Sequence, residues 1–165
     1  MEKPIIAKVN GPAVGLGCSL ALFCDFVYAT PRSKFADPHV SVGLVAGDGG
    51  CVIWPQLIGY ARAKKYLLTG EMIKAEEALD MGLIAEVFAE DEIDNEVQAL
   101  AEKLRDGAKY SIRWTKTSIN AGLKVMANSI IDRAAAFENV TQLMEDHKIA
   151  LEAFAKKETP KFKQK

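Results

Sequence analysis

One glycine-rich segment near the start of the chain restricts the fold more than any other feature. It reads Asn-Gly-Pro-Ala-Val-Gly-Leu-Gly-Cys-Ser over residues 10–19, between an apolar run over residues 4–9 and another over residues 20–24. That order predicts a buried strand, a tight turn and the beginning of a helix. Because Gly15 and Gly17 have no side chain, a ligand oxygen could approach the backbone at a helix start, where the first N–H groups lack intrahelical acceptors.

The spacing of these glycines excludes two common nucleotide-binding motifs. Glycines at positions 11, 15 and 17 do not form Gly-x-Gly-x-x-Gly, and no Gly-Lys-Ser/Thr follows them. The turn instead suits a carboxylate, a phosphate or the oxyanion of a polarised carbonyl. A close-packed turn between strand and helix is the structural alternative, and glycine spacing leaves both open.

The overall composition is that of an ordinary globular protein with a sizeable core. The chain has 165 residues, of which 49% are hydrophobic and 26% charged, and its net charge is −1. We therefore predict no nucleic-acid partner and, since no apolar run has membrane-spanning length, no membrane partner. The three cysteines lack metal-binding spacing, which predicts no metal site and favours a reducing, cytoplasmic location.

The hydrophobic pattern predicts an α/β part followed by a helical part, with the change near residue 90. In residues 1–90 we expect strands over 4–9, 25–30, 34–36 and 83–88, and helices over 16–23, 48–57, 61–68 and 75–81. We expect the second of these helices to be interrupted or ended near Pro55. In residues 91–165 we expect helices over 92–105, 110–127, 129–145 and 148–156.

Residues 10–17, with the apolar helix and Cys24-Asp25 after them, resemble the signature of the crotonase family, the enoyl-CoA hydratase/isomerase superfamily. Later segments agree in order and spacing: Val42-Gly43-Leu44 with Gly49-Gly50, residues 67–70 with 75–78, residues 81–84, and the tail over 146–162. The resemblance implies a crotonase-type ββα spiral over residues 1–90 and a helical C-terminal region over 91–165. It also implies an acyl-CoA thioester as ligand, no cofactor other than that coenzyme A, and a homo-oligomer, either a trimer or a dimer of trimers.

The resemblance further implies that the segments found here belong to the C-terminal portion of the usual chain. The family's N-terminal part carries the first of two backbone amides that hold the thioester oxygen. Because losing one such donor costs about a hundred- to a thousandfold in rate, we expect little turnover from the 165-residue chain alone.

Candidate site residues follow from the same resemblance. The second oxyanion amide is placed on Leu16, flanked by Gly15 and Gly17, and the two positions of the hydratase glutamates are Ser19 and His39. Some relatives carry a working aspartate at about the position of Asp48. The candidate catalytic residues are therefore Asp48, His39 and Ser19. The structural alternatives are a helix cap for Asp48, a loop role for His39 and packing or capping for Ser19.

Two further assignments complete the predicted site. Trp54 is a candidate wall of the acyl pocket, with a core position as the alternative. Lys161 and Lys163, in the tail, are candidate ligands for coenzyme A phosphates, with a solvated basic tail as the alternative.

These observations support two hypotheses about function. The first is an acyl-CoA-transforming enzyme of the enoyl-CoA hydratase/isomerase type, a lyase or isomerase that stabilises a thioester enolate. The second is a catalytically weak or inactive acyl-CoA-binding or assembly subunit of the same fold. The absence of both glutamates favours the second, whereas the glycine turn and Asp48 favour the first.

Overall fold

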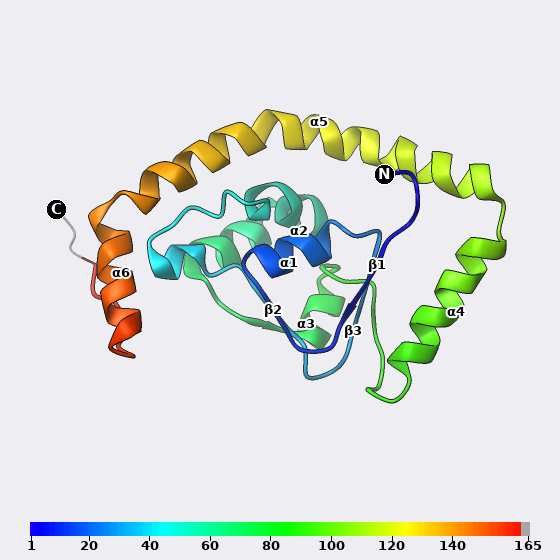
Figure 1. The fold of residues 1–165 in the computed structure, drawn as a ribbon, viewed down its shortest axis with the longest axis horizontal. Helices are drawn as coiled ribbons and strands as arrows, with labels where there is room; N and C mark the ends of the chain where they lie inside the picture. Colours follow the sequence, from blue (N-terminus) through cyan, green and yellow to red (C-terminus); the bar gives the residue numbers. More distant parts are fainter. Residues whose placement is uncertain (163–165) are drawn as a thin grey trace.

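The computed structural model describes residues 1–162 and contains two small sheets surrounded by helices (Figure 1). The first sheet is parallel, with the order β1-β3-β6: β1 (Ile6–Val9), β3 (Phe26–Ala29) and β6 (Glu86–Val87). In the second sheet β4 lies between a parallel and an antiparallel partner: β2 (Pro12–Val14), β4 (Lys34–Ala36) and β5 (Ile73–Lys74). The chain thus alternates between the two sheets as it moves from β1 to β4.

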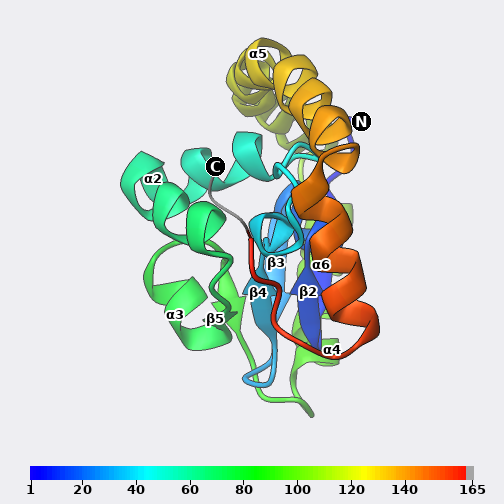
Figure 2. The ribbon, with the colours of Figure 1, turned by 90° about the vertical axis from the view of Figure 1, so that its left-hand side faces the viewer.

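The helices enclose the sheets on several sides. Those before residue 90 are α1 (Leu16–Leu22), the 3-10 helix η1 (His39–Val42), α2 (Gly50–Thr69) and α3 (Ala75–Asp80). They are followed by α4 (Ile93–Asp106), α5 (Lys109–Gln142) and α6 (Glu145–Ala155). Figure 1 shows α5 arching over α1 and α2, with α4 and α6 at its two ends. In the turned view, α2 and α3 lie on one side of the strands and α6 on the other (Figure 2).

The hydrophobic core lies between the strands and helices α1 to α3. Its largest fully buried apolar side chains come from β4, β5, α2 and the segment after α3: Phe35, Ile73, Val52, Trp54 and Leu83. Burial of each such side chain contributes about 1.5–3 kcal/mol, so this contact region holds β4, η1 and the start of α2 in place.

Most predicted elements are present, with different boundaries. The strands predicted over 4–9, 25–30, 34–36 and 83–88 correspond to β1, β3, β4 and β6. Strands β2 and β5 were missed because three and two residues are too few to show an alternating pattern.

One predicted helix break is wrong, and another is present but displaced from Pro55. The predicted helices over 110–127 and 129–145 form the single helix α5. The predicted helices over 48–57 and 61–68 correspond to α2, which begins at Gly50. Its backbone continues as a helix through Pro55 and leaves the helical conformation at Gly59 (φ 76°, ψ 161°), between the two predicted helices. A glycine adopts such positive φ values at little cost, so the change of direction occurs where the side chain is absent.

Helix α6 is attached to η1 at the rim of the molecule. His147 Nδ1 donates a hydrogen bond to the Val42 carbonyl oxygen over 2.7 Å. A Cβ at Gly43 would lie 2.8 Å from the backbone of Asp146 and His147, so only glycine allows this approach. The helical region therefore packs against the segment that carries His39.

Within residues 1–162, none of the helices combines the length and the apolar character needed to cross a bilayer.

The packing of β5 predicts a sharp difference between two neighbouring residues. Ile73 is fully buried opposite Phe35, whereas Met72 is 52% exposed. We expect Ile73→Ala to lower the free energy of unfolding by about 2–5 kcal/mol, because it removes buried methyl groups and leaves a cavity. Met72→Ala should change it by less than about 0.5 kcal/mol. Urea denaturation measures both, and equal losses would contradict this description of the core.

Candidate functional site

The glycine turn joins β2 to α1 and is tied to the second sheet. Gly15 has φ 56° and ψ −128°, a conformation that strains any residue with a Cβ. Its N–H donates to the Ala36 carbonyl oxygen at the end of β4, over 3.0 Å. Gly17 differs, because it lies within α1 and a Cβ there would meet nothing within 4 Å. Gly15 is therefore required by the backbone, whereas a side chain at Gly17 would extend into open space.

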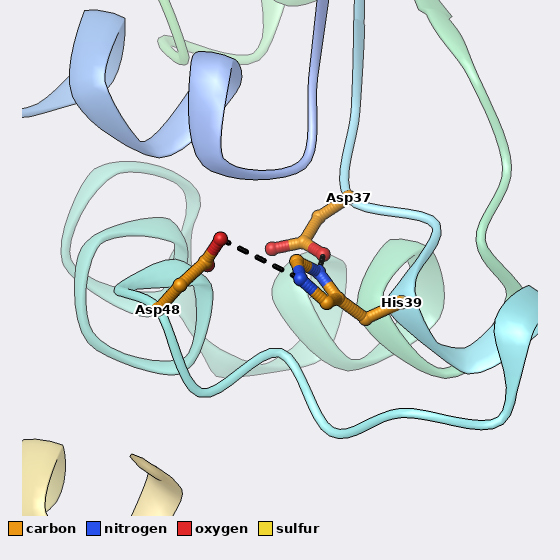
Figure 3. A group of neighbouring side chains, drawn as sticks. All are labelled: Asp37, His39 and Asp48. Atoms are coloured by element: carbon orange, nitrogen blue, oxygen red, sulfur yellow. Dashed lines mark hydrogen bonds and ion pairs between the residues drawn. The ribbon is translucent and has the colours of Figure 1, made fainter. Parts of the chain in front are cut away.

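His39 lies directly next to this turn. A Cβ on Gly15 would be 3.6 Å from His39 Cε1, and the histidine side chain is 13% exposed. Nδ1 of the ring is hydrogen-bonded to Asp37 Oδ1, as Figure 3 shows. Nε2 faces the other way, 3.5 Å from Asp48 Oδ2 and 3.9 Å from Glu138 Oε1.

Asp48 is held between two of the predicted site residues. Ser19, buried on α1, donates a hydrogen bond from Oγ to Asp48 Oδ1 over 3.3 Å, while the other carboxylate oxygen faces His39. The interpretation of Asp48 as the cap of α2 is wrong, because Gly49 occupies the cap position and no side chain caps that helix. The structure thus brings Ser19, His39 and Asp48 together, as expected for one site.

The three glycines beside Asp48 each touch a different element. A Cβ on any of them would overlap atoms of that element: Gly47 with the Ala134 carbonyl oxygen of α5 (2.5 Å), Gly49 with the Phe23 ring (2.8 Å), and Gly50 with Asp37 Oδ2 (1.9 Å). The Gly-Asp-Gly-Gly sequence is therefore a close crossing point of several elements and not merely a flexible helix start.

Hydrogen bonding and charge keep His39 positively charged to higher pH than usual. The hydrogen bond to Asp37 raises the pKa of His39; burial opposes this, and the negative charges of Asp37, Asp48 and Glu138 raise it further. The ring can therefore donate a proton from Nε2 near neutral pH, and an adjacent carboxylate can accept one. This arrangement can perform general acid–base chemistry beside the glycine turn.

Asp37, His39 and Asp48 also offer ligand atoms within 4.8 Å of one another, close enough to share a cation. The two carboxylates, however, face opposite nitrogens of the imidazole ring. The orientation therefore favours direct pairing of each carboxylate with the ring over a shared ion. The expected absence of a metal stays a prediction.

The assignment of Trp54 to an acyl pocket needs correction. Its side chain is fully buried in the core, with its ring centroid 6.2 Å from that of Tyr66. An apolar cavity of about 680 Å³ lies elsewhere, between α1, α2 and α5. Its lining includes Leu22, Phe23, Ile53, Leu57, Ile119 and Leu123.

Of the two candidate lysines in the tail, Lys161 and Lys163, the structure describes only the first. Lys161 is exposed beyond α6, and Lys163 lies outside the described residues. Their contact with coenzyme A phosphates stays a prediction.

Sequence reasoning missed two carboxylates of the cluster. Asp37 precedes a proline, a sequence typical of a turn, yet it is 1% exposed and bonds His39. Glu138, on α5, comes from a helix whose sequence contains no motif. The glycines at 47 and 50 were the available signal, since a Cβ on either would overlap one of these carboxylates.

Comparison with known proteins identifies the family to which this chain belongs. Residues 1–165 match the family described as enoyl-CoA hydratase/isomerase. The chain belongs to this family. Among hydratase relatives, the crotonyl-CoA hydratase of Syntrophomonas wolfei is 36% identical over 98% of this chain, and the short-chain-enoyl-CoA hydratase of Clostridium acetobutylicum is 37% identical over 95%. The chain spans 62% and 60% of the length of these two relatives.

Solved structures confirm the enoyl-CoA hydratase/isomerase fold. An enoyl-CoA hydratase from Mycobacterium avium subsp. paratuberculosis superposes with a TM-score of 0.92 at 30% identity, covering 99% of this chain and 66% of that one. A carnitinyl-CoA dehydratase from Mycobacterium avium superposes equally well, at 34% identity, covering 100% and 66%. The predicted family and fold are thus confirmed.

The two glycines of the turn should respond to alanine with opposite signs. We expect Gly15→Ala to lower the free energy of unfolding by about 1–3 kcal/mol, because alanine is strained at φ 56°. Gly17→Ala should raise it by up to about 1 kcal/mol, because alanine favours the helix and the added methyl meets no atom. Urea denaturation of both variants tests this, and a stabilised Gly15→Ala variant would refute the turn geometry.

Proposed function

We propose that this chain carries the acid–base site of an acyl-CoA enzyme of the hydratase/isomerase type. The observation that supports this most directly is the position of His39, with Nε2 facing Asp48 beside the glycine turn. The turn would hold the thioester oxygen through the Leu16 N–H, and the two side chains would exchange protons with the acyl carbons. Coenzyme A enters only as part of the substrate.

The two proton carriers would have opposite roles, with Asp48 as the base and His39 as the acid. Asp48 would act as the base and remove a proton from carbon or from water. Protonated His39 would return a proton to the enolate. Ser19 would keep the Asp48 carboxylate oriented through its hydrogen bond. Holding the oxyanion with a backbone N–H lowers the barrier because the donor needs no reorganisation as charge develops.

Hydration is the reaction we favour within this class. The hydratase names of the relatives support it, and water addition needs one base and one acid. Isomerisation also needs one base and one acid, which remove a proton from one carbon of the acyl chain and add a proton to another. A weak or inactive acyl-CoA-binding subunit remains the alternative function, since neither hydratase glutamate is present at Ser19 or His39.

We propose that the acyl chain occupies the apolar cavity between α1, α2 and α5. Support comes from Phe23, which contributes to the wall of this cavity and whose ring also lies against Gly49, next to Asp48. The lining is mostly apolar, although Asp25 and Lys116 also border the cavity. Its apolar part favours an apolar acyl group through removal of that group's surface from water.

We also propose assembly into a trimer or a dimer of trimers. Support comes from large apolar side chains exposed on α5, on α6 and at the junction between them, including Phe137, Leu143, Leu151 and Phe154, of which Leu143 is 81% exposed. Apolar surfaces of this kind are typical of protein interfaces. Light scattering after size-exclusion chromatography measures the assembly, and a monomer would contradict the proposal.

The role of Asp48 can be separated from any structural one. In the native protein, Asp48→Asn should lower turnover of the true enoyl-CoA ester at least about a hundredfold, because the base is lost. Stability should change little, since Asp48 caps no helix. Asp80→Asn, at the exposed end of α3, is the matched control and should keep full turnover. Assays across enoyl-, dienoyl- and hydroxyacyl-CoA esters identify the substrate. If Asp48→Asn and His39→Gln both retain turnover, this assignment of proton carriers fails.

The oxyanion role of the turn has its own test. Gly17→Val should weaken binding of crotonyl-CoA at least about tenfold, or about 1.4 kcal/mol, because the side chain would extend into open space in which the thioester is proposed to lie. Gly122→Val in α5 is the matched control, since a Cβ there also meets nothing within 4 Å. Calorimetric titration measures the affinity of both variants for crotonyl-CoA, and equal affinities would contradict binding of the thioester at this turn.

A further inference from the structure

A second carboxylate, Asp37, contacts His39 from the side opposite to the proposed substrate. It follows β4 directly, and its side chain is completely buried. One oxygen, Oδ1, bonds His39 Nδ1, whereas Oδ2 is buried without a hydrogen-bond partner among the described residues. Burying a carboxylate in this way is costly, so a purely structural explanation would need compensating bonds that Oδ2 does not make.

Gly50 supplies the space in which this carboxylate lies. A Cβ on Gly50 would lie 1.9 Å from Asp37 Oδ2 and 3.1 Å from Cγ. No side chain other than hydrogen fits there unless the carboxylate moves away from His39. The first residue of α2 thus controls where Asp37 lies.

We propose that Asp37 is a positioning residue, which holds the neutral His39 ring with its proton on Nδ1 and directs Nε2 toward Asp48, and that Gly50 makes this placement possible. The inference rests on the proposed function, because it assigns His39 its orientation for proton transfer. A histidine whose Nδ1 donates to a carboxylate has a fixed ring and an available Nε2. The same contact stabilises the cation that forms when Nε2 takes up a proton.

The other groups that face the ring cannot replace Asp37. Asp48, before α2, and Glu138, on α5, carry charge but both approach Nε2, and Ser19 on α1 bonds Asp48. Among these groups only Asp37 contacts Nδ1. Removing its charge should therefore change both the protonation and the tautomer of His39, whereas removing Asp48 should leave the tautomer unchanged.

Nitrogen-15 and proton NMR of the imidazole rings tests this without a substrate. The chain has two histidines, and His39→Gln identifies the His39 signals by their loss. We expect the neutral His39 ring of the unaltered protein to carry its proton on Nδ1. Asp37→Asn should lower the pKa of His39, since the hydrogen bond to Asp37 is the main cause of its rise. Gly50→Ala, which displaces the carboxylate, should do the same. Glu77→Gln, which removes a carboxylate bonded to Tyr66 and remote from His39, should leave that pKa unchanged.

Turnover provides the second readout. If protonated His39 is the acid, activity falls as pH rises through its pKa, so Asp37→Asn should move this alkaline limb to lower pH. At pH 8 we expect turnover to fall at least about tenfold.

The possible outcomes separate the two claims. An unaltered protein with its neutral proton on Nε2, or an unchanged His39 pKa in both variants, overturns the positioning role. A lowered pKa with an unchanged pH profile on a confirmed substrate supports the positioning of His39 and refutes its part in catalysis.

Discussion

The site depends on one constraint: several elements must approach Asp48 more closely than side chains normally allow. Gly47 admits the α5 backbone, Gly49 admits Phe23, and Gly50 admits the Asp37 carboxylate. Each contact would be lost with a single added methyl group, because packed interiors have no free volume to absorb it. Residues 47–50, at the start of α2, therefore fix the positions of neighbours that are far apart in sequence.

Close packing around Asp48 also sets the electrostatics of the site. Three carboxylates surround one imidazole, and burial limits how far water can screen them. His39 is the only cationic group that pairs with them among the described contacts, so its protonation balances part of this charge. The raised pKa of His39 is the consequence, and a proton donor near neutral pH is its chemical result.

The fold is that of the enoyl-CoA hydratase/isomerase family, whereas the reactivity of the site depends on its individual side chains. The backbone of the glycine turn, tied to β4 at Ala36, needs no particular side chain to present an N–H group. The positions at which the resemblance implies glutamates carry Ser19 and His39, and both side chains contact Asp48. The backbone of a fold can thus stay the same while the side chains within it change, which is why activity has to be argued from the site and not from the fold.

Local patterns were enough to predict the strands β1, β3 and β4, the glycine turn and the family, because spacing and glycine content act over a few residues. Tertiary packing decided the rest. The two predicted helices that meet at residues 127–129 form the single helix α5, because no residue there is a strong helix breaker. Packing placed Trp54 in the core and brought Asp37 and Glu138 to His39. Those contacts join residues from separate elements, and no local pattern records which side chains will meet when β4, α2 and α5 pack together.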